Sequence, residues 1–149
     1  MSVDITSRVP RKKVSIGKTR EAAQRILAFL GKGRSELSLA LVKDREIREL
    51  NGRYRHRPEP TDVLSFPAGE SFFAGAKMLG DVVISVERAE IQARRRGAPL
   101  EQELERLLIH GILHLLGYDH ERSPKEARVM RQMERKISRA LCGKEAAAV

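Results

Sequence analysis

The sequence has one cysteine, no tryptophan and only 4% aromatic residues. Because Cys142 has no partner for an intrachain disulfide, we expect a reducing compartment and interpret this thiol as a surface or helix-packing residue. The scarcity of aromatic side chains argues against a base-stacking platform as the main mode of nucleic-acid binding. No apolar run suited to a signal peptide lies near the N-terminus, and the longest apolar stretch, LLIHGILHLLG, is too short to span a bilayer. These absences predict a cytoplasmic protein without membrane association.

Positive charge is abundant and unevenly distributed. The formal net charge is +9; residues 1–60 hold 15 Lys and Arg against 7 Asp and Glu, whereas residues 61–149 hold 14 against 13. A basic N-terminal part attracts polyanions, of which RNA is the most abundant in cytoplasm, although acidic lipid or solubility alone would give the same balance. Charge alone leaves these three explanations open; if the substrate is RNA, the basic N-terminal part would hold its backbone without reading its sequence.

The pattern of apolar residues predicts one α+β domain over residues 1–149, with a small mixed sheet packed against helices. A chain of this length can bury a core without disulfides or further domains. We expect the tail, 143–149, to fray, and a first strand before residue 16 is weakly signalled. The expected helices cover 19–30, 44 to about 52, 87–96, 100–116 and the residues from 124 onward, and the expected strands cover 36–43, 62–67 and 78–86.

Three of the four histidines lie within eleven residues, HGILHLLGYDH, at positions 110–120. On the helix expected over 100–116, His110 and His114 project from the same face one turn apart, as two imidazole ligands of one metal ion require. Gly117 can take a left-handed conformation that ends the helix and returns His120 toward the other two. Three imidazoles with one open coordination position predict a catalytic zinc site on a helix and turn.

The alternative is that these are ordinary histidines beside an apolar helix, and the regular spacing around a turn-forming glycine argues against it. Asp119 either orients a ligand histidine or caps the turn, and the sequence leaves both roles open. The fourth histidine, His56, is interpreted as a surface residue. No side chain emerges as a clear general base, and Asp119 is a candidate only because it neighbours His120.

The spacing also matches the zinc metalloprotease motif H-E-x-x-H-x-x-G-x-x-H, except at one position. Gly111 stands where that motif carries its general-base glutamate. Peptide hydrolysis by the usual route then lacks its proton carrier. We therefore treat a metallopeptidase as a weaker alternative.

The segment HGILHLLGYDH resembles the signature of the YbeY family of bacterial zinc-dependent endoribonucleases. Three further segments are similar to the family's and occur in the family's order: ELNGRYR (49–55), PTDVLSFP (60–67) and LGDVVIS (79–85). The resemblance implies cleavage of single-stranded RNA in ribosomal RNA processing, notably maturation of the 16S rRNA 3′ end, and in ribosome quality control. It implies rRNA and the small ribosomal subunit as partners.

For the site, the resemblance implies one Zn²⁺ per chain held by His110, His114 and His120, with His114 and Arg55 as catalytic residues. Arg55 would also bind substrate, its guanidinium clamping a phosphate that the metal polarises. The chain departs from the family at Pro58, where an aspartate is common, and Glu59 either replaces that carboxylate or has no such role. The rival from another class is an RNA-binding ribosome-assembly factor whose zinc is not catalytic.

Overall fold

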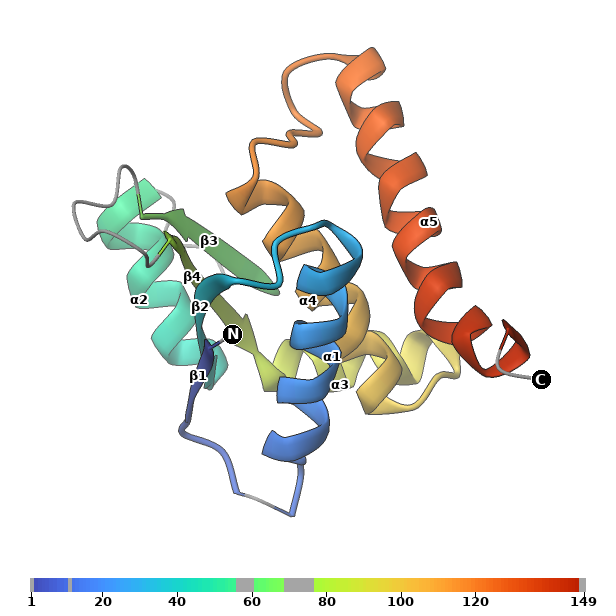
Figure 1. The fold of residues 1–149 in the computed structure, drawn as a ribbon. Helices are drawn as coiled ribbons and strands as arrows, with labels where there is room; N and C mark the ends of the chain where they lie inside the picture. Colours follow the sequence, from blue (N-terminus) through green and yellow to red (C-terminus); the bar gives the residue numbers. More distant parts are fainter. Residues whose placement is uncertain (1, 11, 56–60, 69–76, 148–149) are drawn as a thin grey trace.

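The computed structural model describes the whole chain except residues 1, 11, 56–60, 69–76 and 148–149 (Figure 1). Its described part forms an α+β domain around a four-stranded mixed sheet, as the sequence predicts. In chain order the elements are β1 (Ser2–Ser7), α1 (Ile16–Phe29), β2 (Ser35–Val42), α2 (Asp44–Arg55), β3 (Val63–Pro67), β4 (Lys77–Ser85), α3 (Val86–Arg96), α4 (Leu100–Leu115) and α5 (Pro124–Ala147).

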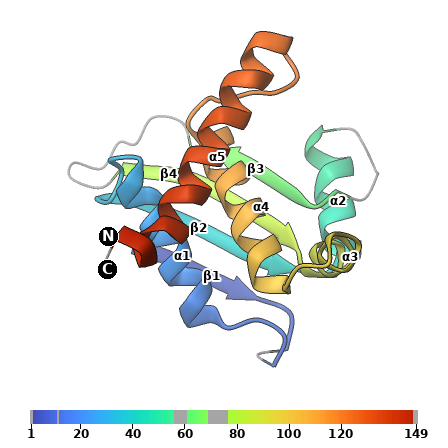
Figure 2. The same ribbon diagram turned by 90° about the vertical axis from the view of Figure 1, so that its right-hand side faces the viewer.

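The sheet has the strand order β1-β2-β4-β3. Strands β1, β2 and β4 run parallel, and β3 pairs antiparallel with β4 at one edge. Helix α2 covers one face of the sheet, α1 and α4 cover the other, and α5 forms an outer layer over α1 and α4 (Figures 1 and 2). Helix α4 therefore lies between the sheet and α5, where both can position its side chains.

The hydrophobic core follows the period of two in β2. Leu37, Leu39 and Leu41 are at most 1% exposed and pack on the α1 and α4 side of the sheet. On the α2 side, Val42 and Ile47 belong to a smaller buried cluster. Alternate side chains of a strand point to opposite faces, so one short segment supplies apolar residues to both layers. The larger of the two buried clusters lies on the α1 and α4 side, so close packing sets the position of α4 on the sheet.

The end of one helix differs from the sequence prediction. Helix α2 continues to Arg55, so the predicted end near Asn51 and Gly52 is wrong. Asn51 is buried in the fold, and a glycine inside a helix costs only about 1 kcal/mol, which tertiary packing readily outweighs. The weakly signalled first strand is present as β1, because pairing with β2 completes it. Helix α5 continues to Ala147, and fraying of 143–149 stays a prediction.

The predicted helix ends are confirmed at the two helices flanking α4. Gly97 has φ 64°, in the left-handed region, and terminates α3. The Ser123 hydroxyl accepts a hydrogen bond from the Glu126 backbone N–H at 3.1 Å and so caps the start of α5. No helix within the described ranges is both long and apolar enough to cross a membrane.

Candidate metal centre

The C-terminal end of α4 and the turn after it bring three histidines together. His110 and His114 lie one turn apart on α4, which ends at Leu115. Gly117 has φ 98°, and its N–H donates to the His114 carbonyl at 3.1 Å. A residue with a Cβ rarely adopts this conformation, so glycine permits the reversal that carries His120 back over the helix end. The turn predicted from the sequence is the one that forms.

The three imidazoles have the spacing of ligands around one ion. The Nε2 atoms of His110 and His114 are 3.1 Å apart, and one nitrogen from each of the three rings lies within 4.8 Å of the others. The ring centroid of His120 is 5.2 Å from that of each partner. With Zn–N bonds of about 2.0–2.1 Å, ligand nitrogens of a tetrahedral site are about 3.3 Å apart. Three imidazole nitrogens that converge in this way form a donor set suited to a divalent metal ion such as zinc.

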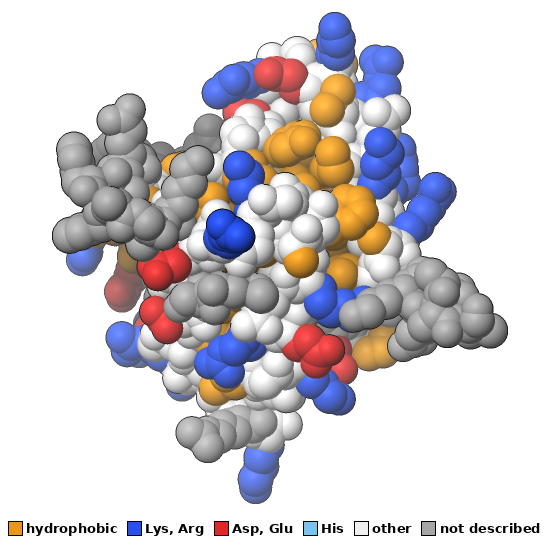
Figure 3. All heavy atoms as spheres, in the orientation of Figure 1, with side chains coloured by type: hydrophobic (Ala, Val, Ile, Leu, Met, Phe, Trp, Pro, Cys, Tyr) orange, Lys and Arg blue, Asp and Glu red, His pale blue; other side chains and the backbone are white. Residues whose placement is uncertain are grey.

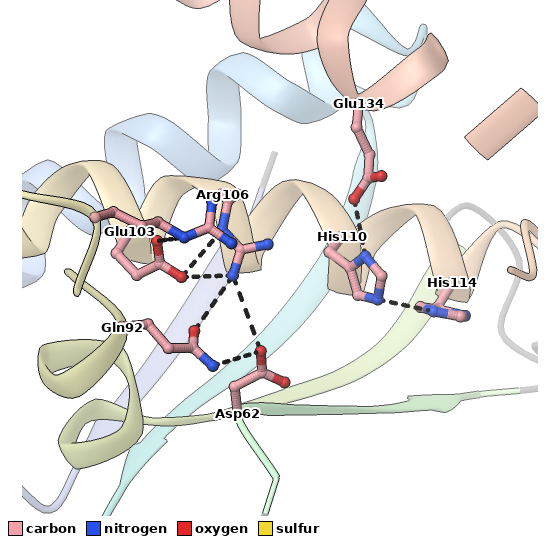
Figure 4. Close-up of polar contacts among 8 residues, drawn as sticks. Asp62, Gln92, Glu103, Arg106, His110, His114 and Glu134 are labelled. Atoms are coloured by element: carbon pink, nitrogen blue, oxygen red, sulfur yellow. Dashed lines mark hydrogen bonds and ion pairs between the residues drawn. The ribbon is translucent and has the colours of Figure 1, made fainter. Parts of the chain in front are cut away.

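Glu134 on α5 fixes the orientation of the first histidine. Its Oε2 lies 2.8 Å from the Nδ1 of His110, on the ring edge opposite His114 (Figure 4). When Nδ1–H donates to this carboxylate, the Nε2 of the neutral ring carries the free lone pair. Glu134 thus selects the tautomer whose Nε2 can bind a metal, a role common for carboxylates behind ligand histidines.

The electrostatics of Glu134 agree with an ionised carboxylate. Burial by itself would raise the pKa of Glu134, but the hydrogen bond from His110 and the nearby charge of Arg106 outweigh it, so the pKa lies below its usual value. An ionised carboxylate is the stronger acceptor for Nδ1–H. Glu134 was not among the residues predicted from the sequence. A signal was available, because this acid shares the inward face of α5 with Met130 and Ile137.

Asp119 contacts the backbone of the turn and a neighbouring arginine. Its Oδ1 accepts the Glu121 backbone N–H at 2.8 Å, and its Oδ2 lies 3.3 Å from the Nε of Arg122. The hydrogen bond from Glu121 is the largest cause of the lowered pKa of Asp119, and the positive charge of Arg122 adds to it. Of the two roles left open by the sequence, these contacts support turn capping.

Gly111 lies where α4 packs closely against the sheet. A Cβ at this position would lie 2.8 Å from Cγ1 of Val82 and 3.3 Å from Cγ2 of Val63. The buried Ser65 hydroxyl donates to the Gly111 carbonyl at 2.9 Å and ties β3 to α4. A side chain at 111 would therefore point into the sheet, so the glutamate of the protease motif has no room here.

An ion-pair network holds α4 one turn before the first histidine. Glu103 is only 2% exposed and contacts the Arg106 guanidinium at 2.5 Å. Arg106 also donates to Gln92 of α3 at 3.2 Å and lies 4.0 Å from the carboxylate of Asp62 (Figure 4). Because Asp62 immediately precedes β3, the network fixes the start of that strand relative to α4. It supports the site without belonging to it.

The other predicted site residues lie at the limit of what the structure describes. Arg55 is the last residue of α2, and its side chain is outside the described part of the chain. His56, Pro58 and Glu59 also fall outside the described residues. The functional role of Arg55 and the surface position of His56 stay predictions.

Replacing Glu134 with glutamine is expected to weaken metal binding about 10–100-fold without unfolding the domain. The amide keeps the shape of the side chain but loses the negative charge that orients and polarises the His110 ring. The affinity is measured for the apoprotein by competition with a chromophoric zinc chelator.

Glu101→Gln is the matched control, because Glu101 is an exposed acid at the far end of α4. It should bind zinc as the wild type does. Equal zinc affinities for Glu134→Gln and wild type would show that the Glu134 contact does not support the metal site.

Fold and site together define a class: a small α+β protein that presents three histidines from a helix and the following turn as candidate metal ligands. The family model described as Endoribonuclease YbeY matches residues 4–142. An Endoribonuclease YbeY of Aquifex aeolicus is 49% identical, the match covering 90% of this chain and 91% of that protein. One from Anaeromyxobacter dehalogenans is also 49% identical, the match covering 94% of this chain and 72% of its length.

A solution structure of a Thermotoga maritima protein shares the fold, with a TM-score of 0.65 and 28% identity; the match covers 98% of this chain and 93% of the other. The extent of the family match and the similarity to the two curated relatives over most of their length lead to one conclusion. This chain belongs to the YbeY family of endoribonucleases.

Proposed function

We propose that this protein is a zinc-dependent endoribonuclease that cleaves single-stranded RNA. The observation that supports this most directly is the convergence of His110, His114 and His120, whose donor nitrogens lie within 4.8 Å of one another. His120 is 44% exposed at its side chain, so a polymeric substrate can reach the site. Three protein ligands leave a fourth position for water or substrate, which is typical of catalytic rather than structural zinc.

Zinc, when bound, would lower the pKa of a water molecule and polarise a phosphoryl oxygen of the substrate. The residues of this chain would hold and orient the ion. The three histidines would supply the ligand nitrogens, and Glu134 sets the tautomer of His110. Arg55 is proposed to clamp the phosphate through the paired donors of its guanidinium. A glutamate beside the first histidine is not needed in this scheme, and Gly111 serves the packing of α4 instead.

The cellular substrate is proposed to be ribosomal RNA, with the small ribosomal subunit as partner and the cytoplasm as location. The protein would act in maturation of the 16S rRNA 3′ end and in ribosome quality control. The resemblance of HGILHLLGYDH and its three accompanying segments to the family supports these proposals. An RNA-binding assembly factor with a non-catalytic zinc is the competing hypothesis, and RNA cleavage separates the two.

Removing the metal is expected to abolish RNA cleavage, and adding zinc back should restore it. Purified protein is treated with a chelator, dialysed, and assayed on labelled single-stranded rRNA before and after stoichiometric Zn²⁺ is added. The loss follows because the nucleophile and the polarised phosphate both depend on the ion.

The same samples are tested on casein and on a duplex RNA of equal length. We expect no peptide turnover and much slower duplex cleavage. Peptide hydrolysis that follows the zinc content would favour the metallopeptidase, whereas RNA binding without cleavage by the zinc-loaded protein would favour the assembly factor.

A further inference from the structure

The outer face of α5 carries a continuous row of basic side chains. We call this row the α5 basic face; its six members are Lys125, Arg128, Arg131, Arg135, Lys136 and Arg139. All six side chains are exposed, and none forms an ion pair within the described part of the chain. The neighbouring Arg122, by contrast, pairs with Asp119 and Glu126.

Helical geometry places the α5 basic face opposite the buried side of the helix. At 3.6 residues per turn, Arg128, Arg135 and Arg139 point almost directly away from the fully buried Met130 and Ile137. Figures 2 and 3 show α5 as the outermost layer, with Lys and Arg side chains along the margin it forms. From residue 125 to 139 the row is about 21 Å long, at about 1.5 Å per residue.

The two acids in the described part of this helix, Glu126 and Glu134, do not neutralise the row. Glu134 faces the histidine site and contacts His110, and Glu126 pairs with Arg122 at 3.8 Å. Like charges three and four residues apart on one helix face repel, so this arrangement works against helix stability. Folding alone does not require six such cations on one face, and a bound polyanion would offset their repulsion.

The position of the α5 basic face relates it to the metal centre. Arg131 is three residues before Glu134, which reaches the first histidine of the site. Successive arginines three or four residues apart are about 5–6 Å from one another on the helix surface, a suitable spacing for a chain of phosphates. The near-zero net charge of residues 61–149 does not reveal this basic face, because most of the acidic residues in that range lie on elements other than α5.

We propose that the α5 basic face binds the phosphate backbone of the RNA substrate beyond the point of cleavage. This inference rests on the proposed ribonuclease function, and it assigns the substrate track to the C-terminal helix in addition to the basic N-terminal residues. Arginine and lysine contacts to phosphate position a strand without reading its sequence. The scarcity of aromatic residues agrees with a surface that binds through charge rather than stacking.

The test is the salt dependence of RNA binding by the triple variant Arg128→Gln, Arg131→Gln, Arg135→Gln. Glutamine keeps helix propensity, so α5 should persist, which circular dichroism verifies. Removal of one phosphate-binding cation should lower the slope of log Kd against log salt by about 0.7 for single strands, and removal of all three by about 2. Affinity at low salt should fall on the order of tenfold. In cleavage assays KM should rise while kcat stays close to wild type.

The matched control removes exposed positive charge that belongs to neither basic surface: Arg94→Gln, Arg95→Gln. Both arginines are exposed in the last turn of α3, outside the basic N-terminal part and outside the α5 basic face. The control should keep the wild-type slope and KM. An equal loss of slope per removed cation in the control and in the α5 triple variant would show that only net charge matters and would overturn the proposal.

The outcomes also separate this inference from the proposed function. If the zinc-loaded wild type cleaves RNA and the α5 triple variant binds it with an unchanged salt slope, the inference fails while the nuclease function stands. If the slope falls as expected but wild type never cleaves RNA, the α5 basic face stands as an RNA-binding surface and the nuclease proposal fails. Binding of the wild type to anionic lipid vesicles but not to RNA would reject the proposed occupant.

Discussion

Replacing Gly111 with glutamate, which recreates the protease motif, is expected to destabilise the fold by at least about 3 kcal/mol rather than create a protease. The new Cβ would lie 2.8 Å from Val82, which is fully buried and, being β-branched, cannot rotate away freely. The carboxylate would then enter the apolar contact between α4 and the sheet without a cationic partner. Urea unfolding followed by circular dichroism measures the loss of stability.

A graded series sharpens this test. Gly111→Ala gains about 1 kcal/mol of helix propensity but overpacks the contact by about 1–3 kcal/mol, so we expect a small net loss of stability. Gly17→Glu is the control, because Gly17 is exposed in the first turn of α1, where a negative charge is favourable. An unfolding midpoint for Gly111→Glu equal to wild type would disprove the packing role of Gly111.

The part of the site that is local in sequence was predictable from it. His110 and His114 follow the helical period, and Gly117 supplies the positive φ that the reversal requires, so the convergence of three rings depends on one helix and one turn. The alternating leucines of β2 and the cap at Ser123 depend in the same way on neighbouring residues. Local rules of period and capping are enough for such features.

The features missed depend on contacts between distant segments. Glu134 is 24 residues from His110, and only the packing of α5 on α4 brings them together. The extension of α2 through Gly52 depends on tertiary burial of that helix. The first strand, β1, had only a weak signal in the sequence because pairing with β2 completes it. The interpretation of Gly111 changed most. In the sequence it marks only the absence of the protease glutamate, whereas in the structure it allows α4 to pack closely against the sheet.

Replacing His114 with alanine is expected to remove stoichiometric zinc binding and to lower RNA cleavage by roughly a thousandfold. His114 is the middle ligand: its Nε2 is 3.1 Å from that of His110, and its ring centroid lies 5.2 Å from that of His120. The two remaining imidazoles are one ligand short of the three protein ligands of a catalytic zinc site. The variant would therefore hold the ion weakly and without a fixed geometry. Elemental analysis and single-turnover cleavage of labelled rRNA measure the two effects.

His56→Ala is the control for metal content, because the sequence predicts no ligand role for the fourth histidine, and it should bind zinc as the wild type does. RNA binding by His114→Ala should persist, since the basic residues of α5 stay in place. Loss of RNA cleavage with unchanged RNA binding is the result expected of a catalyst. An assembly factor without catalytic activity would have no cleavage to lose. Cleavage by His114→Ala at the wild-type rate would instead point to a contaminating nuclease and contradict catalysis at this centre.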